Sequence, residues 1–170
     1  MKTFYKIVVF TILFGFGSCD YLDIVPDNIA TIEYSFRNRA SAEKYLFTCY
    51  SYRPPIGSAT NDVAMQGGDD SWRLYTKTPP GNAFIARGFQ TATNPYVNNW
   101  DGSNGGKALW QGVRDCNIFL ENIDKVNDLS DYEKSRWVAE VKFLKAYYHY
   151  YLFKCYGPIP IIDVNLPISA

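Results

Sequence analysis

Apolar residues recur at helical spacing in three stretches of the chain. In the first stretch, residues 41–52, they form a single stripe made of Ala42, Tyr45, Leu46, Cys49 and Tyr52. Ser41 can cap the start of this helix through its hydroxyl, and Pro54 and Pro55 are expected to end it. The pattern therefore predicts a first helix from Ser41 to Tyr52.

The other two stretches predict longer helices joined by a short turn. Residues 107–125 repeat apolar positions every three or four residues, although Gly112 costs about 1 kcal/mol relative to alanine and requires compensation from tertiary packing. The SDYE sequence at residues 130–133 is a capping box, in which Ser130 and Glu133 each accept from the other's backbone amide. The third helix then continues to Tyr156. Two long helices with a short connection predict an antiparallel hairpin.

Aromatic side chains surround the third helix on most sides. Its core face is predicted to consist of Trp137, Val141, Leu144, Tyr148 and Tyr151. Trp110 of the second helix also lies at core spacing, so both tryptophans are predicted to have structural roles. The other sides carry Phe143, Tyr147, Tyr150 and Phe153. A helix that is apolar all round needs neighbours on more than one face, and three helices do not supply them. We therefore expect part of the native fold to be missing from these 170 residues.

Residues 53–106 differ in composition from the predicted helices. They hold eight of the twelve glycines and five of the nine prolines, which indicates a long loop. Long loops of this kind are generally functional or disordered. The loop also carries six aromatic residues, which disordered segments lack, and we therefore expect it to be ordered.

The N-terminus has the three-part layout of a secretory signal. Lys2 and Lys6 precede an apolar run, residues 7–16, and two small residues follow. The run is too short to span a bilayer, which takes about 20 apolar residues. Cys19 comes next, and this order resembles the lipobox of bacterial lipoproteins, although Phe16 stands where leucine is commoner. The alternative is a cysteine near an ordinary cleavage site.

This layout divides the chain into three parts. Residues 1–18 are interpreted as a lipoprotein signal peptide, residues 19–40 as an extended tether with Cys19 as the lipid attachment site, and residues 41–170 as a helical domain. Loss of residues 1–18 lowers the basic count from 17 to 15 against 17 acidic residues, so nothing favours nucleic acid.

The remaining titratable residues do not suggest catalysis. His149 is the only histidine, and neither a nucleophile motif nor a zinc spacing accompanies it. We therefore expect no enzymatic activity, no cofactor and no metal. Cys49, Cys116 and Cys155 lie in apolar helical patterns, which favours buried free thiols, although one pair with one cysteine left over remains open.

The final segment carries the strongest family resemblance. The sequence AEVKFLKAYYHYYLFKCYGPIPII resembles the SusD/RagB family of outer-membrane nutrient-binding lipoproteins, as do CDYLDIVP, SAEKYLFTCYSY and ALWQGVRDCNIFLENID before it. The matching residues in that segment are Glu140, Phe143, Leu144, Ala146, Tyr147, Tyr156, Gly157 and Pro160. Lys145 stands where the family has arginine, which loses a bidentate donor. The resemblance implies an all-α fold of tetratricopeptide-like helical hairpins with a long irregular loop insertion.

The resemblance also implies a function. Members of the family lie on the cell surface, lipid-anchored to the outer membrane, and hand captured oligosaccharide to a SusC-like TonB-dependent transporter. Implied ligand-binding residues in the loop are Trp72, Tyr75, Tyr96, Asn98, Asn99 and Trp100, because aromatic rings stack on sugars and amides bond their hydroxyls. The alternative is that these rings bind no ligand and only hold the loop against the helices. The resemblance leaves room for a peptide-binding or other nutrient-binding lid, and for a scaffold that docks to the transporter without binding ligand.

Overall fold

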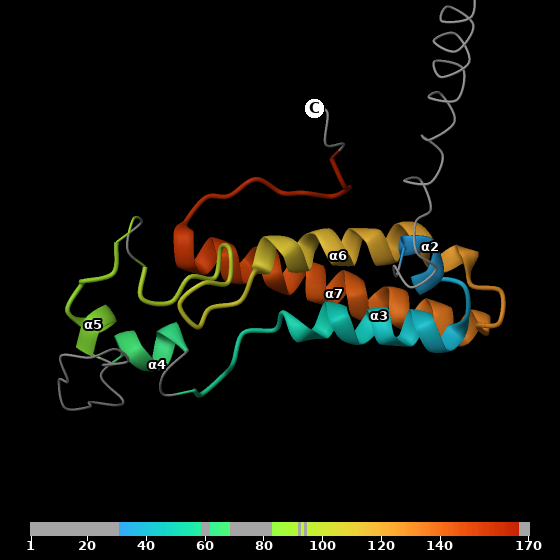
Figure 1. The fold of residues 1–170 in the computed structure, drawn as a ribbon. Helices are drawn as coiled ribbons and strands as arrows, with labels where there is room; N and C mark the ends of the chain where they lie inside the picture. Colours follow the sequence, from blue (N-terminus) through green and yellow to red (C-terminus); the bar gives the residue numbers. More distant parts are fainter. Residues whose placement is uncertain (1–30, 59–61, 69–82, 92, 94, 167–170) are drawn as a thin grey trace, which may run out of the picture. The chain divides into compact units, whose positions relative to one another are not determined.

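The computed structural model describes residues 31–58, 62–68, 83–91, 93 and 95–166 (Figure 1). The chain divides into two units, residues 1–34 and 35–170, and the second unit contains every helix described below except α2, which spans the boundary. Cys19, Trp72 and Tyr75 lie outside the described residues. All regular elements of the described part are helices, which confirms the all-α fold class.

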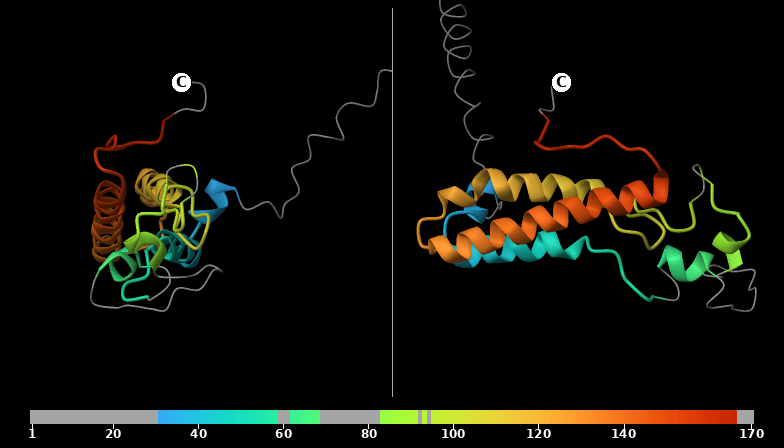
Figure 2. Two further views of the ribbon diagram at one scale, coloured as in Figure 1. Left: turned by 90° about the vertical axis from the view of Figure 1, so that its left-hand side faces the viewer. Right: turned by 180° about the vertical axis from the view of Figure 1, so that it is seen from behind.

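Three helices of the second unit pack side by side. They are α3 (Arg39–Ser51), α6 (Leu109–Asn122) and α7 (Asp131–Tyr156), and each contacts the other two (Figures 1 and 2). The predicted antiparallel hairpin is the α6–α7 pair, with the short 3₁₀ helix η1 (Ile123–Lys125) in its connection. None of the helices in the described part is both long enough and apolar enough to cross a membrane.

The core lies between the three helices. Five predicted residues of α7 are buried in it, namely Trp137, Val141, Leu144, Tyr148 and Tyr151. The opposite side of α7 is exposed, with Phe143, Tyr150 and Phe153 each more than half accessible. Helix α7 therefore carries apolar residues on several sides, as predicted, and Phe143, Tyr150 and Phe153 are left uncovered within the described residues.

Helix α3 starts earlier than the sequence predicts. Its N-cap is Asn38, whose backbone is extended and whose Oδ1 accepts from the Ser41 amide at 2.9 Å, so Ser41 lies inside the first turn. The tether predicted for residues 19–40 is also wrong for its last residues. Phe36 is buried against the rings of Tyr45 and Phe119, at 5.1 and 5.8 Å between ring centroids. The short helix α2 (Ile32–Ser35) precedes it.

The cap of α7 is the predicted one, with one difference. The Glu133 amide donates to Ser130 Oγ at 3.3 Å, but the Glu133 carboxylate accepts from the Ser130 hydroxyl rather than from its amide. Its other oxygen accepts from Arg39 Nη2 at 2.8 Å, which ties the start of α3 to the start of α7. The Arg39 guanidinium also lies over the Trp137 ring, at 5.5 Å.

The long loop contains two short helices, α4 (Val63–Gly67) and α5 (Ala83–Ala86), which pack on each other. Asp62 caps α4 by accepting from the Ala64 amide at 3.0 Å. Described residues after α5 have no regular structure until α6 begins at Leu109, two residues later than predicted. Hydrogen bonds of side chains within residues 98–107 hold this part of the loop in place before α6.

A C-terminal segment, residues 157–166, runs back along α6 and α7 (Figure 1). The Ile162 amide donates to His149 Nε2 at 3.1 Å, and Lys145 Nζ donates to the Asp163 carbonyl at 2.7 Å. The Asn165 amide donates to Glu121 on α6. Lys145, which replaces the arginine of the family pattern, thus holds this segment through one ammonium group.

Candidate functional site

Trp100 is the centre of an aromatic cluster built from three parts of the chain. Its ring lies 5.4 Å from that of Trp110, in the first turn of α6, and 5.4 Å from that of Tyr156, the last residue of α7. Both contacts are edge-to-face, and Trp110 makes a third with His149 at 5.9 Å. Edge-to-face pairs at these distances are a favourable arrangement of aromatic rings. The loop and both hairpin helices therefore meet at Trp100.

Trp100 remains 45% exposed in spite of these contacts. Hydrogen bonds within the loop, rather than burial of the ring, hold the backbone of Trp100 in place. Asn98 Oδ1 accepts from the Trp100 amide at 2.9 Å and from the Asp101 amide at 3.4 Å, which is an Asx turn. Because the side chain of a turn residue holds it in place, the exposed indole is presented by an ordered backbone.

Tyr156 connects this turn to α7. Its hydroxyl oxygen accepts from the Asn99 amide at 2.9 Å and its hydroxyl donates to Asn98 Oδ1 at 3.5 Å. Burial, above all, raises the pKa of Tyr156, so the phenol stays protonated at neutral pH. Asn99 is 1% exposed, and its Oδ1 accepts from the Lys107 amide at 3.0 Å. The side chain of Asn99 thus braces the loop from inside.

Gly106 permits the return of the loop to α6. A Cβ at this position would overlap the Asn98 carbonyl oxygen, so no side chain fits there. The sequence predicts only a loop for the glycine-rich stretch around it, DGSNGG. In the structure this stretch lets the chain fold tightly against the turn that presents Trp100.

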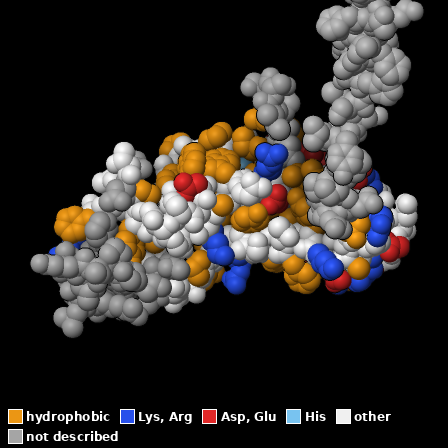
Figure 3. Space-filling model, in the orientation of Figure 1, with side chains coloured by type: hydrophobic (Ala, Val, Ile, Leu, Met, Phe, Trp, Pro, Cys, Tyr) orange, Lys and Arg blue, Asp and Glu red, His pale blue; other side chains and the backbone are white. Residues whose placement is uncertain are grey.

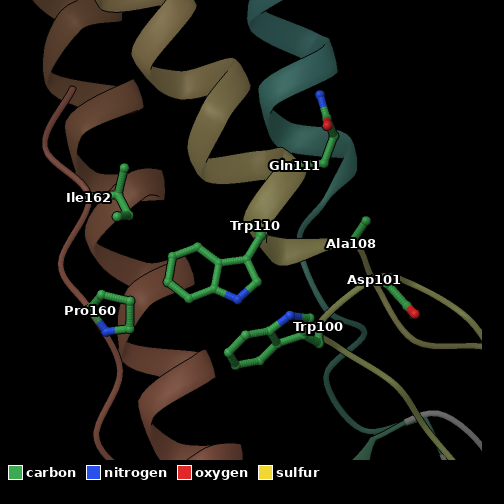
Figure 4. Close-up of a pocket in the computed structure, with 7 residues that line it drawn as sticks. All are labelled: Trp100, Asp101, Ala108, Trp110, Gln111, Pro160 and Ile162. Atoms are coloured by element: carbon green, nitrogen blue, oxygen red, sulfur yellow. The ribbon is translucent and has the colours of Figure 1, made fainter. Parts of the chain in front are cut away.

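Two hollows flank Trp100, and both include Asp101 in their lining. The tryptophan hollow, of about 580 Å³, is lined by Trp100, Asp101, Ala108, Trp110, Gln111, Pro160 and Ile162 (Figure 4). The tyrosine hollow, of about 670 Å³, is lined by Gln90, Thr91, Pro95, Asn98, Trp100, Asp101, Cys155 and Tyr156. Volumes in this range are typical of small-molecule sites.

The two hollows differ in chemistry. The tryptophan hollow has two indoles, and the C-terminal segment closes its far side with Pro160 and Ile162 (Figure 4). The tyrosine hollow offers more hydrogen-bonding groups, with two amide side chains and two hydroxyls. Asp101, shared by both, is ionised, because hydrogen bonds from the Ser103 amide and hydroxyl, both at 2.8 Å, hold its pKa below the usual value.

The structure brings together only part of the predicted site. Trp100 lines both hollows and Asn98 lines the tyrosine hollow. Asn99 is buried beneath them. Tyr96 is half-buried and lines neither hollow. The helical spacing of Trp110 predicts a structural role in the core, yet this residue is only half-buried and lines the tryptophan hollow. Trp137, for which the spacing predicts the same role, is 1% exposed, as expected.

Comparison with known families identifies the class of protein. A family model described as "Starch-binding associating with outer membrane", of the SusD-like type, matches residues 56–166. The chain therefore belongs to the SusD-like family of outer-membrane-associated, starch-binding proteins, a family of binding proteins. The matched range includes the long loop from residue 56 on, α6, α7 and the C-terminal segment, and hence every residue of both hollows. No curated protein matches the chain.

Proposed function

We propose that this protein is a cell-surface lipoprotein that binds oligosaccharide at the two hollows beside Trp100 and passes it to a TonB-dependent transporter. The observation that carries the proposal is the half-exposed indole of Trp100, presented between a mostly apolar hollow and one with more polar groups. Sugar rings have C–H faces that stack on such an indole, and hydroxyls that need polar partners nearby. The role is binding without bond cleavage.

The two hollows suit an oligosaccharide better than a single sugar. Trp100 and Asp101 line both of them, so adjacent sugar units can contact one indole and one carboxylate from two sides. Asn98 has its Oδ1 occupied by loop amides, whereas the ionised carboxylate of Asp101 can accept from sugar hydroxyls. We expect maltooligosaccharides to bind more tightly than glucose, because only the longer ligand occupies both hollows.

Calorimetric titration with soluble starch, maltooligosaccharides, other polysaccharides and peptides tests this proposal. Each aromatic stack is worth about 1 kcal/mol, so Trp100→Ala should weaken glycan binding about fivefold. Tyr132→Ala is a matched control, because Tyr132 is 76% exposed at the opposite end of α7. Equal loss in both variants, or glycan binding unaffected by Trp100→Ala, would place the ligand elsewhere. Binding of peptides in place of glycans would favour a peptide-binding lid.

The exposed side of α7 supports the alternative of a docking scaffold. Phe143 and Tyr150 are more than half accessible there, and Ile161, Val164 and Leu166 of the C-terminal segment are also exposed. Figure 3 shows hydrophobic side chains gathered along the edge of the molecule where the C-terminal segment runs. If the protein bound no glycan but bound the purified transporter, the scaffold would be favoured over the glycan-binding protein.

The membrane anchor is a separate part of the proposal. Residues 1–18 would be removed as a signal peptide, and acyl chains on Cys19 would hold the protein at the outer membrane, each contributing about 0.8 kcal/mol per buried methylene. Residues from Cys19 up to α2 would serve as the tether. Cys19→Ala should abolish palmitate labelling and release the protein from the membrane fraction. Unchanged retention of this variant would refute the anchor.

A further inference from the structure

Cys49 of α3 and Cys116 of α6 lie together in the core. Both are 0% exposed and belong to the same cluster of buried side chains. A hydrogen bond between the two thiols raises the pKa of Cys49, and burial raises it further. Cys155 is only half-buried and lines the tyrosine hollow near the end of α7. The three described thiols therefore divide into one adjacent pair and one separate cysteine.

The helices that carry this pair approach each other unusually closely. A Cβ at Gly112 of α6 would lie only 2.9 Å from Tyr52 Cβ. Gly112 is one helical turn before Cys116, and Tyr52 directly follows α3, three residues after Cys49. A disulfide needs its two Cα atoms within about 4.4–6.8 Å of each other, so it requires a close approach of the two backbones. The missing side chain at Gly112 brings the two backbones toward that range.

The backbone at Cys49 is also held in place. The Tyr148 hydroxyl of α7 donates to the Cys49 carbonyl oxygen at 2.5 Å, and the Tyr52 hydroxyl donates to Asp115 Oδ2 at 2.6 Å. Asp115 immediately precedes Cys116, and Tyr45 donates to its other oxygen at 3.3 Å. Hydrogen bonds on both sides of the thiol pair therefore fix the register of α3 against α6.

We propose that Cys49 and Cys116 form a disulfide that joins α3 to α6 when the chain folds in an oxidising compartment. The inference does not depend on glycan binding. Export through the bacterial periplasm would supply oxidising conditions. The oxidant is a low-molecular-weight disulfide, whose S–S bond is reduced to two thiols while the two cysteines lose two protons and two electrons and form one new S–S bond.

The burial of the pair predicts when this reaction takes place. Only a thiolate attacks a disulfide, and the raised pKa of Cys49 disfavours the thiolate once the core has closed. Oxidation is therefore expected during folding and not in the folded, reduced protein. Once formed, the bond is shielded in the same way, and reductant should reach it only after unfolding.

Peptide mapping tests the pairing. The full chain carrying Cys19→Ala, with three thiols left, is refolded with oxidised and reduced glutathione, denatured with excess N-ethylmaleimide and digested without reductant. We expect one linked peptide that joins residues 49 and 116, an alkylated Cys155, and, before alkylation, a protein mass about 2 Da below that of the reduced chain. Cys155→Ser should leave the linked peptide unchanged, and Cys49→Ala should remove it.

Three outcomes would overturn the proposal. The first is that all three thiols are alkylated after refolding, and the second is a linked peptide that contains Cys155. The third is that the folded and the unfolded reduced protein are oxidised equally fast. The first two outcomes are measured on a protein without any core substitution, so they remain decisive even if Cys49→Ala fails to fold. A higher urea midpoint for the oxidised than for the reduced protein is the expected consequence of a cross-link that closes a long loop.

Discussion

Gly112→Ala tests the close packing that organises the three-helix core. Alanine favours helix formation by about 1 kcal/mol over glycine, so an isolated α6 would gain from the change. In the folded protein the added Cβ would lie 2.9 Å from Tyr52 Cβ, 3.0 Å from Tyr52 Cγ and 3.1 Å from Tyr148 Cδ2. Carbon atoms in good contact are about 3.5–4.0 Å apart, so both rings have to move.

Neither ring can move without loss. The Tyr52 hydroxyl is bonded to Asp115 and the Tyr148 hydroxyl to the Cys49 carbonyl, and each such hydrogen bond is worth about 1 kcal/mol. Overpacking a core by one methyl group typically costs about 1–3 kcal/mol. Loss of one of these hydrogen bonds and the helix-propensity gain are both about 1 kcal/mol and offset each other, so we expect Gly112→Ala to lower the free energy of unfolding by about 1–3 kcal/mol.

Urea denaturation followed by far-UV circular dichroism measures this change. A loss of that size lowers the urea midpoint by roughly 0.5–1.5 M at an m-value of about 2 kcal/mol/M, which is usual for small domains. Gly67→Ala is the matched control, since Gly67 is also helical and its added Cβ would lie 3.5 Å from Ile85 Cγ2, an ordinary contact. A Gly112→Ala protein as stable as the parent, or more stable, would refute the close approach of α3, α6 and α7.

Two further predictions concern the ends of α7. Tyr156→Phe removes the acceptor of the Asn99 amide and loosens the turn that presents Trp100, so glycan affinity in calorimetry should fall while helix content stays unchanged. At the other end, the hydrogen bond from Arg39 is the main cause that lowers the pKa of Glu133. This contribution to stability is present above the unfolded pKa of glutamate and lost as pH falls through the lower folded pKa, so acid urea titrations of Glu133→Gln should show a weaker pH dependence. Equal slopes for parent and variant would contradict the Arg39–Glu133 contact.

The helices of this protein could be predicted from the sequence because their signals are local. The three- and four-residue repeats predict α7 and the start of α6 within two residues, and the predicted end of α6 at Lys125 includes the 3₁₀ helix η1. Ser130 marks the start of α7 by bonding an amide three residues away. The local sequence does not decide where α3 begins. Asn38 and Ser41 are both good caps, and the helix begins after Asn38, where Phe36 is packed against Tyr45 and Phe119.

The candidate site depended on contacts between distant parts of the chain. Periodicity assigned Trp110 to the core, but the exposure of its ring is set by Trp100 and the C-terminal segment. Asn99 was expected at the ligand surface because it is polar and lies in a loop, yet it is buried beneath Tyr156. A helix is specified by neighbours within four residues, so the sequence alone determined it. Which loop side chains face solvent depends on packing across the whole fold, so only the tertiary structure decided it.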